Sequence, residues 1–568
     1  MHSPIRVLLS TAALMALCAC ATPRASPQAS ATPAALPNEH SSVYGLYLAG
    51  EAALASGDSQ SASALFGRAQ AAKPDAQFLK DRLFIAALMA GDVSKASVLA
   101  SSPSALDDGG LGALVQAVEA LSQGKGADAY ADLSKPQPLV GAGALLKPWT
   151  AAAAGRWSDA LAMPASGDRL LRLVAAMDQA ILFEHARRYP EAETAFKALQ
   201  ADKAAGGLVA DPYGAFLERR GRRAEAIALY DQAIADNPDD RQLTAARARA
   251  GANRAAPPMP TLREGAAEAL MVPAAAMLAD KQEELGLVYL RLILRLDPRR
   301  DDAQVLTGQV LEALGDLRAA REAYLQLGPK ALRYPDARTR LAFTYQSDDM
   351  PTALKIARET VAARPDSDMA RLALADLLRA DDQFEESTKV LDPLIASMGA
   401  RADWQLYYRR AMALERSNRW PEAQRDLDKA LQLRPDEPEV LNYLGYSWVN
   451  RGLKIKDGMA MIQKAVDAQP EEGAFVDSLG WAYYRLGDFA KSVATLEHAV
   501  SLDAGDAEIN DHLGDAYWRV GRRDEAKFQW RAVLTMKPDA QIKARAEAKL
   551  ASEEGPDAVI GAVPVQHP

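Results

Sequence analysis

The chain has 568 residues, a formal net charge of −9 and a pI near 5.5. The acidic balance and the lack of any sustained run of Lys or Arg exclude the basic surface of a nucleic-acid-binding protein. The length exceeds that of one compact core, and the 49% hydrophobic content with only 6% aromatic residues favours closely packed helices.

The first twenty residues have the pattern of a secretory signal. A basic start is followed by an almost wholly apolar run from Val7 to Leu17, and then by Cys18-Ala19-Cys20. The apolar run is about half of the roughly 20 residues that are needed to span a bilayer, so a permanent transmembrane helix is disfavoured. We therefore predict a signal peptide over residues 1–19.

The end of this segment, Leu17-Cys18-Ala19-Cys20, resembles the bacterial lipobox, in which a Leu and a small residue precede a Cys that receives a lipid on its thiol. The resemblance implies that Cys20 is the lipid attachment residue. With Ala21 after it, the pattern is similar to that of lipoproteins sorted to the outer membrane, facing the periplasm. Residues 20–42 are rich in Pro, Ser and Ala, and we expect them to form a disordered tether.

From residue 43 onward, one pattern recurs about every 34 residues. Two copies near the C-terminus show it clearly: Leu479-Gly480, Tyr483, Gly487, Ser492 and Leu496, and then Leu513-Gly514, Tyr517, Gly521, Ala526 and Trp530. A Gly in the middle of the first helix lets a second helix approach closely, and a Gly after it permits the positive φ that ends the helix. Such hairpins cannot bury their apolar faces alone, so they must stack into a solenoid.

The spacing and residue types resemble the tetratricopeptide repeat. The resemblance implies an all-α fold, a right-handed superhelix of about fourteen helical hairpins in two arrays. A Pro-rich break around Pro257 separates the arrays. We predict an N-terminal array over residues 43–240, a helix and linker over 241–266, a C-terminal array over 267–538, a capping helix over 539–554 and a disordered tail over 555–568.

In tetratricopeptide folds the first helix of each repeat lines a concave groove, so the resemblance also implies a protein-binding surface. In the C-terminal repeats its candidate residues are Tyr408, Tyr446, Asn450, Trp481, Tyr484, Arg485, Asp515, Trp518 and Arg519. Large aromatic side chains beside Arg, Asn and Asp are the composition of interface hot spots. The alternative is that Tyr484 and Trp518, each next to a Tyr that we assign to packing, widen the core instead.

Residues suited to catalysis are sparse. The six histidines are scattered, and the only cysteines, Cys18 and Cys20, lie at the N-terminus, so neither a disulfide framework nor a Cys/His zinc site can form. We find no Gly-x-Ser-x-Gly elbow, no His-Glu-x-x-His helix and no phosphate-binding Gly-rich loop. The prediction is a protein that is not an enzyme, with no catalytic residue, no metal and no cofactor.

The layout resembles that of long tetratricopeptide lipoproteins that bind and activate a periplasmic carboxyl-terminal processing protease. The blocks LNYLGYSW, DSLGWAYYRLG and INDHLGDAYWRVGR carry this resemblance. It implies a lipid-anchored envelope adaptor that holds a protein or peptide, with the protease and its substrates as candidate partners, the membrane contacted through the lipid, and no nucleic acid. The alternatives are an assembly factor for outer-membrane proteins or exported polysaccharide, and an enzyme with a site assembled from scattered residues.

Overall fold

A computed structural model describes residues 42–100, 110–134, 142–163, 169–202, 206–238 and 240–557. Helices joined by short turns make up this part of the chain, and it contains no strand, which confirms the all-α fold class. The helices divide into two compact units, whose boundary in the sequence lies between Arg364 and Pro365. The predicted signal peptide, Cys20 and the predicted tether up to residue 41 lie outside the described residues.

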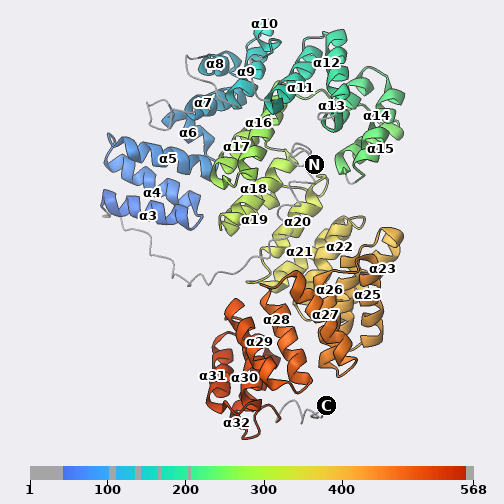
Figure 1. Cartoon of the computed structure of the whole chain (residues 1–568). Helices are drawn as coiled ribbons and strands as arrows, with labels where there is room; N and C mark the ends of the chain where they lie inside the picture. The colour runs from blue at the N-terminus through green and yellow to red at the C-terminus, as the bar shows by residue number, and fades with distance from the viewer. Residues whose placement is uncertain are drawn as a thin grey trace. The chain divides into compact units, whose positions relative to one another are not determined.

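Figure 1 labels the helices of both units. Those of the first unit are α3 (Val43–Ala55), α4 (Ser59–Ala72), α5 (Gln77–Ala90), α6 (Val93–Leu99), α7 (Leu111–Ser122), α8 (Gly126–Asp132), α9 (Ala142–Ala153), α10 (Trp157–Ala160), α11 (Arg169–His185), α12 (Tyr189–Ala201), α13 (Gly206–Arg219), α14 (Arg223–Asp236), α15 (Arg241–Gly251), α16 (Leu262–Ala279), α17 (Glu283–Leu296), α18 (Asp301–Ala313), α19 (Leu317–Leu325), α20 (Tyr334–Phe343) and α21 (Met350–Ala363). Those of the second unit are α22 (Asp368–Ala380), α23 (Phe384–Met398), α24 (Trp404–Arg416), α25 (Trp420–Leu433), α26 (Pro438–Asn450), α27 (Ile455–Ala468), α28 (Gly473–Arg485), α29 (Phe489–Leu502), α30 (Ala507–Arg519), α31 (Arg523–Thr535) and α32 (Ala540–Ala551).

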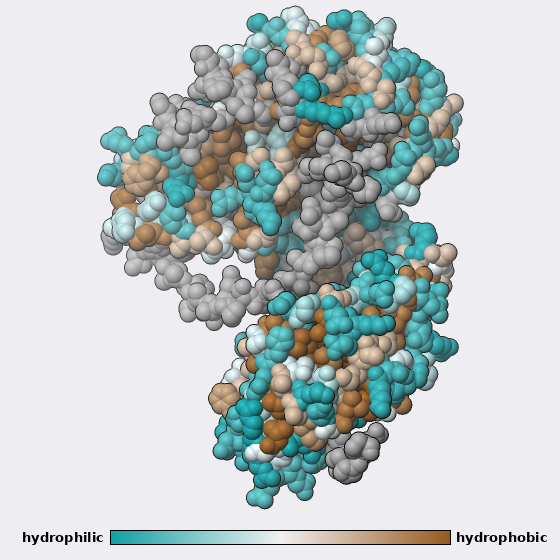
Figure 2. Space-filling model, viewed as in Figure 1, coloured by the Kyte–Doolittle hydropathy of each residue, from teal (hydrophilic) through white to brown (hydrophobic). Residues whose placement is uncertain are grey.

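Consecutive helices pair as hairpins. Six hairpins run from α3 and α4 to α13 and α14, three from α16 and α17 to α20 and α21, and five from α22 and α23 to α30 and α31. The described residues thus hold fourteen hairpins, which agrees with the predicted number of repeats. Within each unit neighbouring hairpins also contact one another, and Figure 2 shows apolar residues in patches among hydrophilic ones on the visible face.

A recurring Gly-Asp pair ends the first helix of a hairpin and begins the second. Gly487 has a φ of 80°, in the left-handed region where glycine is favoured. Asp488 follows as the N-cap of α29 and accepts a hydrogen bond of 3.3 Å from the backbone N–H of Lys491. The same pair occurs at Gly57-Asp58, Gly91-Asp92 and Gly315-Asp316. Local sequence therefore determines where these hairpins turn.

Two further glycines explain why the helices of a hairpin approach so closely. A Cβ on Gly514 of α30 would lie 2.4 Å from Nε1 of Trp530 on α31, and a Cβ on Gly214 of α13 would lie 2.3 Å from Cε1 of Tyr230 on α14. Both aromatic side chains are fully buried. Because an aromatic ring fills the space that a side chain would take, a larger residue at either glycine would separate the helices.

The first unit folds back on itself. Helices α16 and α17 contact α5, α7, α9 and α11, which are first helices of their hairpins, and Figure 1 shows α16–α19 running through the middle of this unit. Arg295 of α17 donates hydrogen bonds of 2.8 and 2.9 Å to the buried carboxylate of Glu119 on α7. The buried ring of Trp149 on α9 fills the space beside Gly265 of α16. This side of the second to fifth hairpins is therefore covered by the chain itself.

A non-helical stretch that contains Pro257 lies between α15 and α16. Arg219 of α13 donates a hydrogen bond of 3.4 Å to the carbonyl of Pro257, which ties this stretch to the helices before it. The predicted array boundary at residues 241–266 and the boundary of the compact units at Arg364 are thus different places. The repeat period indicates where the array is interrupted. It does not indicate which distant repeats pack against each other.

Candidate protein-binding surface

Trp481 and Tyr484 of α28, which the sequence assigns to an exposed groove, are buried. Their exposed fractions are 4% and 0%. The Trp481 ring stacks between Tyr484, at 4.7 Å between centroids, and His512 of α30, at 4.2 Å. Tyr483, which the sequence assigns to packing, is only partly buried. The assignment of Trp481 and Tyr484 to a binding surface is therefore wrong, because their rings fill the space between adjacent hairpins and widen the core.

Charged side chains are buried next to these rings and form one layer with them. His512 Nδ1 lies 3.0 Å from both carboxylate oxygens of Asp477. Lys549 of α32 is 1% exposed and donates hydrogen bonds of 2.8 Å each to Asp511 and Asp515 of α30. Asp515, predicted to meet a partner, is fully buried, so that prediction is also corrected: its carboxylate is paired with Lys549 inside the protein.

The pKa values of two of these groups are shifted in ways that the geometry explains. Burial lowers the pKa of His512, but the negative charge of Asp477 outweighs it and raises the pKa to about 9. Burial raises the pKa of Asp515 to about 6, against the opposing effect of the Lys549 ammonium. At neutral pH, His512 is therefore a buried imidazolium ion paired with Asp477.

The stability of this layer should fall as the pH rises above neutrality. His512 has a raised pKa in the folded chain, so its contribution is complete below the unfolded pKa of about 6.5 and is lost as the pH rises through about 9. We expect His512→Gln to be less stable than the unaltered chain at pH 7, and the difference to shrink by on the order of 2 kcal/mol between pH 7 and pH 9.5. Thermal melting by circular dichroism at a series of pH values measures it. A difference that stays constant over this range would mean that His512 is not charged.

The residues that pair in this buried layer are separated by about one repeat period in the sequence. Lys549 and Asp515 are 34 residues apart, and both His512 with Asp477 and Arg519 with Tyr484 are 35 residues apart. One repeat period therefore separates side chains that meet on neighbouring inner helices. His512 and Lys549 were not predicted, because each repeat was considered by itself. Opposite charges one repeat period apart are the sequence signal that indicates such pairs.

The C-terminal segment covers the last two predicted residues, Trp518 and Arg519. The Arg519 Nε donates a hydrogen bond of 2.9 Å to the Tyr484 hydroxyl, and its Nη1 donates one of 2.9 Å to the carboxylate of Asp557. Gly555 is buried against Trp518, where a Cβ would lie 2.4 Å from the indole. Residues 555–557, which the sequence places in a disordered tail, are thus packed on α30, while the rest of that tail lies outside the described residues.

Arg485 and Asn450 lie at the edge of this region. The Arg485 Nη1 donates a hydrogen bond of 2.7 Å to the backbone carbonyl of Asn450, which joins the ends of α28 and α26. Asn450 is exposed and Arg485 is partly buried. Both remain accessible, so the structure is consistent with a surface role for this pair, which stays a prediction.

Tyr408 and Tyr446 are the predicted aromatic residues that remain partly exposed away from the C-terminal segment. They belong to a surface on α24 and α26 that we call the tyrosine face, which consists of Tyr408, Glu439, Asn442, Tyr443 and Tyr446. The four residues on α26 share one side of that helix by their spacing, and the rings of Tyr408 and Tyr443 meet edge to face with centroids 5.6 Å apart. Tyr443 was not among the predicted site residues.

The tyrosine face contains polar atoms without partners. Asn442 Oδ1 and Glu439 Oε2 are buried and have no hydrogen-bond partner among the described residues. Burial, together with the negative charge of Glu439, raises the pKa of Tyr408 to about 12, and burial likewise raises the pKa values of Tyr443 and Tyr446. These phenols are therefore neutral at physiological pH, and the face offers aromatic rings beside two free acceptors.

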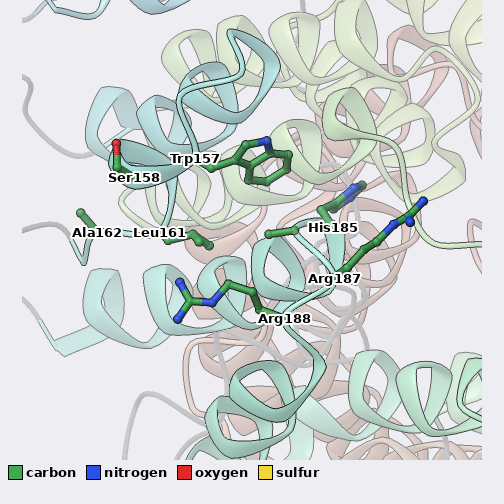
Figure 3. A pocket seen from close by; sticks show the side chains of 8 residues that line it. Trp157, Ser158, Leu161, Ala162, His185, Arg187 and Arg188 are labelled. Atoms are coloured by element: carbon green, nitrogen blue, oxygen red, sulfur yellow. The ribbon is translucent and has the colours of Figure 1, made fainter.

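A separate pocket of about 630 Å³ lies in the first unit (Figure 3). It is lined by Trp157, Ser158, Leu161, Ala162, His185, Ala186, Arg187 and Arg188. Figure 3 shows the side chains of Arg187 and Arg188 pointing in opposite directions. Arg188 is already paired with Glu191 at 2.8 Å, so the lining has no pattern specific to one ligand.

The described ranges lack two features of other protein classes. No group of three or more His, Cys, Asp or Glu in them could hold a metal ion. None of the helices there combines the length and the apolar character needed to cross a bilayer.

Family models of the tetratricopeptide repeat match residues 214–242, 404–437 and 477–506. These segments of the chain are thus tetratricopeptide repeats, a repeat type that builds protein-binding scaffolds. The chain is 26% identical over 216 residues to the TPR repeat-containing protein PA4667 of Pseudomonas aeruginosa, an alignment that covers 38% of this chain and 36% of that protein. It is 25% identical over 215 residues to the human protein O-mannosyl-transferase TMTC1, which covers 37% of this chain and 24% of that protein.

These alignments span about a third and about a quarter of the lengths of the two relatives. Among solved structures, the Cut9–Hcn1 hetero-tetramer of the APC/C is similar over 90% of this chain and 97% of that one, with 14% identity and a TM-score of 0.38. Yeast Tom70 is similar over 89% of this chain and 95% of that one, with 13% identity and a TM-score of 0.29.

Proposed function

We propose that this protein is a lipid-anchored scaffold of the cell envelope that binds a protein or peptide on the tyrosine face of its second unit. The observation that carries the proposal is the set of half-buried aromatic rings beside two buried, unpartnered acceptors, Asn442 Oδ1 and Glu439 Oε2. A buried polar atom without a partner is costly. A ligand that supplies hydrogen-bond donors, as a polypeptide backbone does, removes that cost.

The other inner faces are less suitable for a partner. In the first unit, α16 and α17 cover the first helices of the early hairpins. On α28 and α30, the predicted anchors other than Arg485 are either core residues or lie beneath residues 555–557. The tyrosine face is therefore the part of the predicted surface that supports binding best, and aromatic residues with two side-chain torsions bind at low entropic cost.

The proposed partner is a carboxyl-terminal processing protease of the same organism, which the scaffold would bring together with its substrates at the membrane. The resemblance of the blocks around Tyr446, Trp481 and Trp518 supports this choice. The scaffold itself supplies no catalytic group in this proposal. Its contribution is to raise the local concentration of enzyme and substrate, which increases the rate of proteolysis without a new catalytic group.

Removing the two free acceptors should weaken binding without unfolding the protein. We expect Glu439→Ala with Asn442→Ala to lower the affinity for the purified protease about tenfold, the effect of losing roughly 1.4 kcal/mol of hydrogen bonding. Isothermal titration calorimetry measures the affinity. Gln405→Ala with Asp436→Ala is the matched control, because both residues are exposed on the same unit. Unchanged affinity in the first variant would place the contact elsewhere, and no binding by the unaltered chain would exclude the protease.

The lipid anchor is tested separately. In cells, Cys20→Ser should leave the protein exported but shift it from the membrane fraction to the soluble fraction, since a single acyl chain binds membranes only marginally and stable attachment needs the fuller modification of a lipoprotein. Fractionation followed by immunoblotting measures the distribution. If the variant sediments with membranes as the unaltered chain does, Cys20 does not carry the anchor.

A further inference from the structure

Helix α3 carries an exposed apolar stripe. Tyr44 and Leu48 are 70% and 48% exposed, and Ala52 and Ala55 further along are exposed as well. Residues with this spacing share one side of a helix. The opposite side packs against α4 through residues such as the buried Leu46. The stripe is thus a continuous apolar surface on the first described helix.

The helix at the other end of the described chain differs. On α32 the exposed positions include Gln541, Lys543 and Glu547, as expected for a terminal helix of a repeat array, whose outer face must be soluble. Along the α3 stripe the neighbouring charge is Glu51, which is paired with Arg82 at 2.9 Å. The α3 stripe therefore presents no unpaired acidic group that an anionic surface would repel.

We propose that this stripe lies against the lipid bilayer beside the acyl chains on Cys20. The inference rests on the proposed lipid anchor. Residues 21–42 separate Cys20 from α3, and a stretch of this length spans at most roughly 75 Å. Anchoring thus holds α3 close to the membrane at a high effective concentration, so a weak apolar contact is sufficient to dock it.

The size and chemistry of the stripe fit a bilayer better than a second copy of the chain. Four side chains of this size expose far less area than the roughly 800 Å² per partner that a stable protein interface buries. A tyrosine places its ring in an apolar layer and its hydroxyl in water, which is the arrangement found at membrane interfaces. Leu48 and the two alanines add apolar surface without any polar group to desolvate.

Chemical coupling tests this contact independently of acylation in the cell. The chain from Cys20 to Pro568 contains one thiol, which can be joined to a maleimide lipid in phosphatidylethanolamine and phosphatidylglycerol vesicles that carry a photoactivatable diazirine in their acyl chains. We expect adducts on residues 43–55 to be at least fivefold more frequent than on residues 523–535. The second segment contains Phe528, which is 67% exposed, and it is therefore a matched exposed aromatic control.

Tyr44→Asp with Leu48→Asp should reduce this ratio to about one, whereas Phe528→Asp should leave it unchanged. Equal labelling of the two segments in the unaltered chain would overturn the proposal, even if Cys20 proves to be acylated in cells. Sedimentation velocity of the uncoupled chain provides the second test. A dimer that the double variant abolishes would assign the stripe to a second copy and would also overturn the proposal.

Discussion

Tyr484→Ala should lower the free energy of unfolding of the second unit by about 3–5 kcal/mol, whereas Tyr483→Ala should lower it by only about 1 kcal/mol. Tyr484 is fully buried, stacks on Trp481 and accepts a hydrogen bond from Arg519. Its truncation leaves a cavity and an unpaired guanidinium nitrogen. Tyr483 is partly exposed, with the Lys491 ammonium 5.5 Å from its ring centroid. Its truncation therefore opens mainly to solvent.

Native-state hydrogen exchange of the full chain, followed on peptides from α28 and α30, measures the opening free energy of this region without requiring the second unit to fold alone. The comparison is sharp because the two tyrosines are adjacent in one helix and differ only in the direction they face. A larger loss for Tyr483→Ala would restore the original sequence assignment and contradict the packing of α28 described above.

Lys549→Met should destabilise the C-terminal end of the second unit by about 3–5 kcal/mol, the usual cost of removing one member of a buried ion pair. The Lys549 ammonium is the shared partner of Asp511 and Asp515, which are 1% and 0% exposed. Methionine keeps the volume of the side chain but leaves two buried carboxylates close together. Lys543→Met is the matched control, because Lys543 lies on the same helix and is exposed.

A second set of variants separates charge from packing in the same place. Adding Asp511→Asn and Asp515→Asn to Lys549→Met should recover part of the lost stability, since a neutral buried site costs less than an unpaired charge. Hydrogen exchange of peptides from α30 and α32 reports the effect. If the triple variant is less stable than Lys549→Met alone, the loss came from packing and not from the carboxylates.

The fold was predictable because its signals are local. Glycines such as Gly487 and Gly514 fix a turn and a close helix contact from their own positions in the repeat, so the 34-residue period determines the hairpins and their number. The pairing of a small residue with an aromatic residue on the facing helix can be recognised without knowledge of distant parts of the chain. The all-helical solenoid therefore followed from residue types and spacing alone.

The exposure of the candidate binding residues could not be predicted from the sequence, because it depends on neighbouring hairpins. The repeat frame places Tyr408, Tyr446, Trp481 and Tyr484 on the inner side of first helices, but it does not show which of them a neighbour will cover. Trp481 is covered because His512 from the next hairpin stacks on it. The packing of residues 555–557 on α30 could not be predicted either, because these residues lie outside the repeat period and form a short turn.

The return of α16–α19 into the first unit has a consequence for the order in which that unit is made. Hydrogen bonds from Arg263 to Ser122 and from Arg318 to Asp58 join residues 141 and 260 positions apart, whereas a simple array completes each contact with the next repeat. More than 300 residues must therefore emerge, from the ribosome or across a membrane, before α3 and α4 gain all of their partners. Until then the early hairpins lack some of their packing partners, so this unit should fold slowly and need protection from aggregation while the chain emerges.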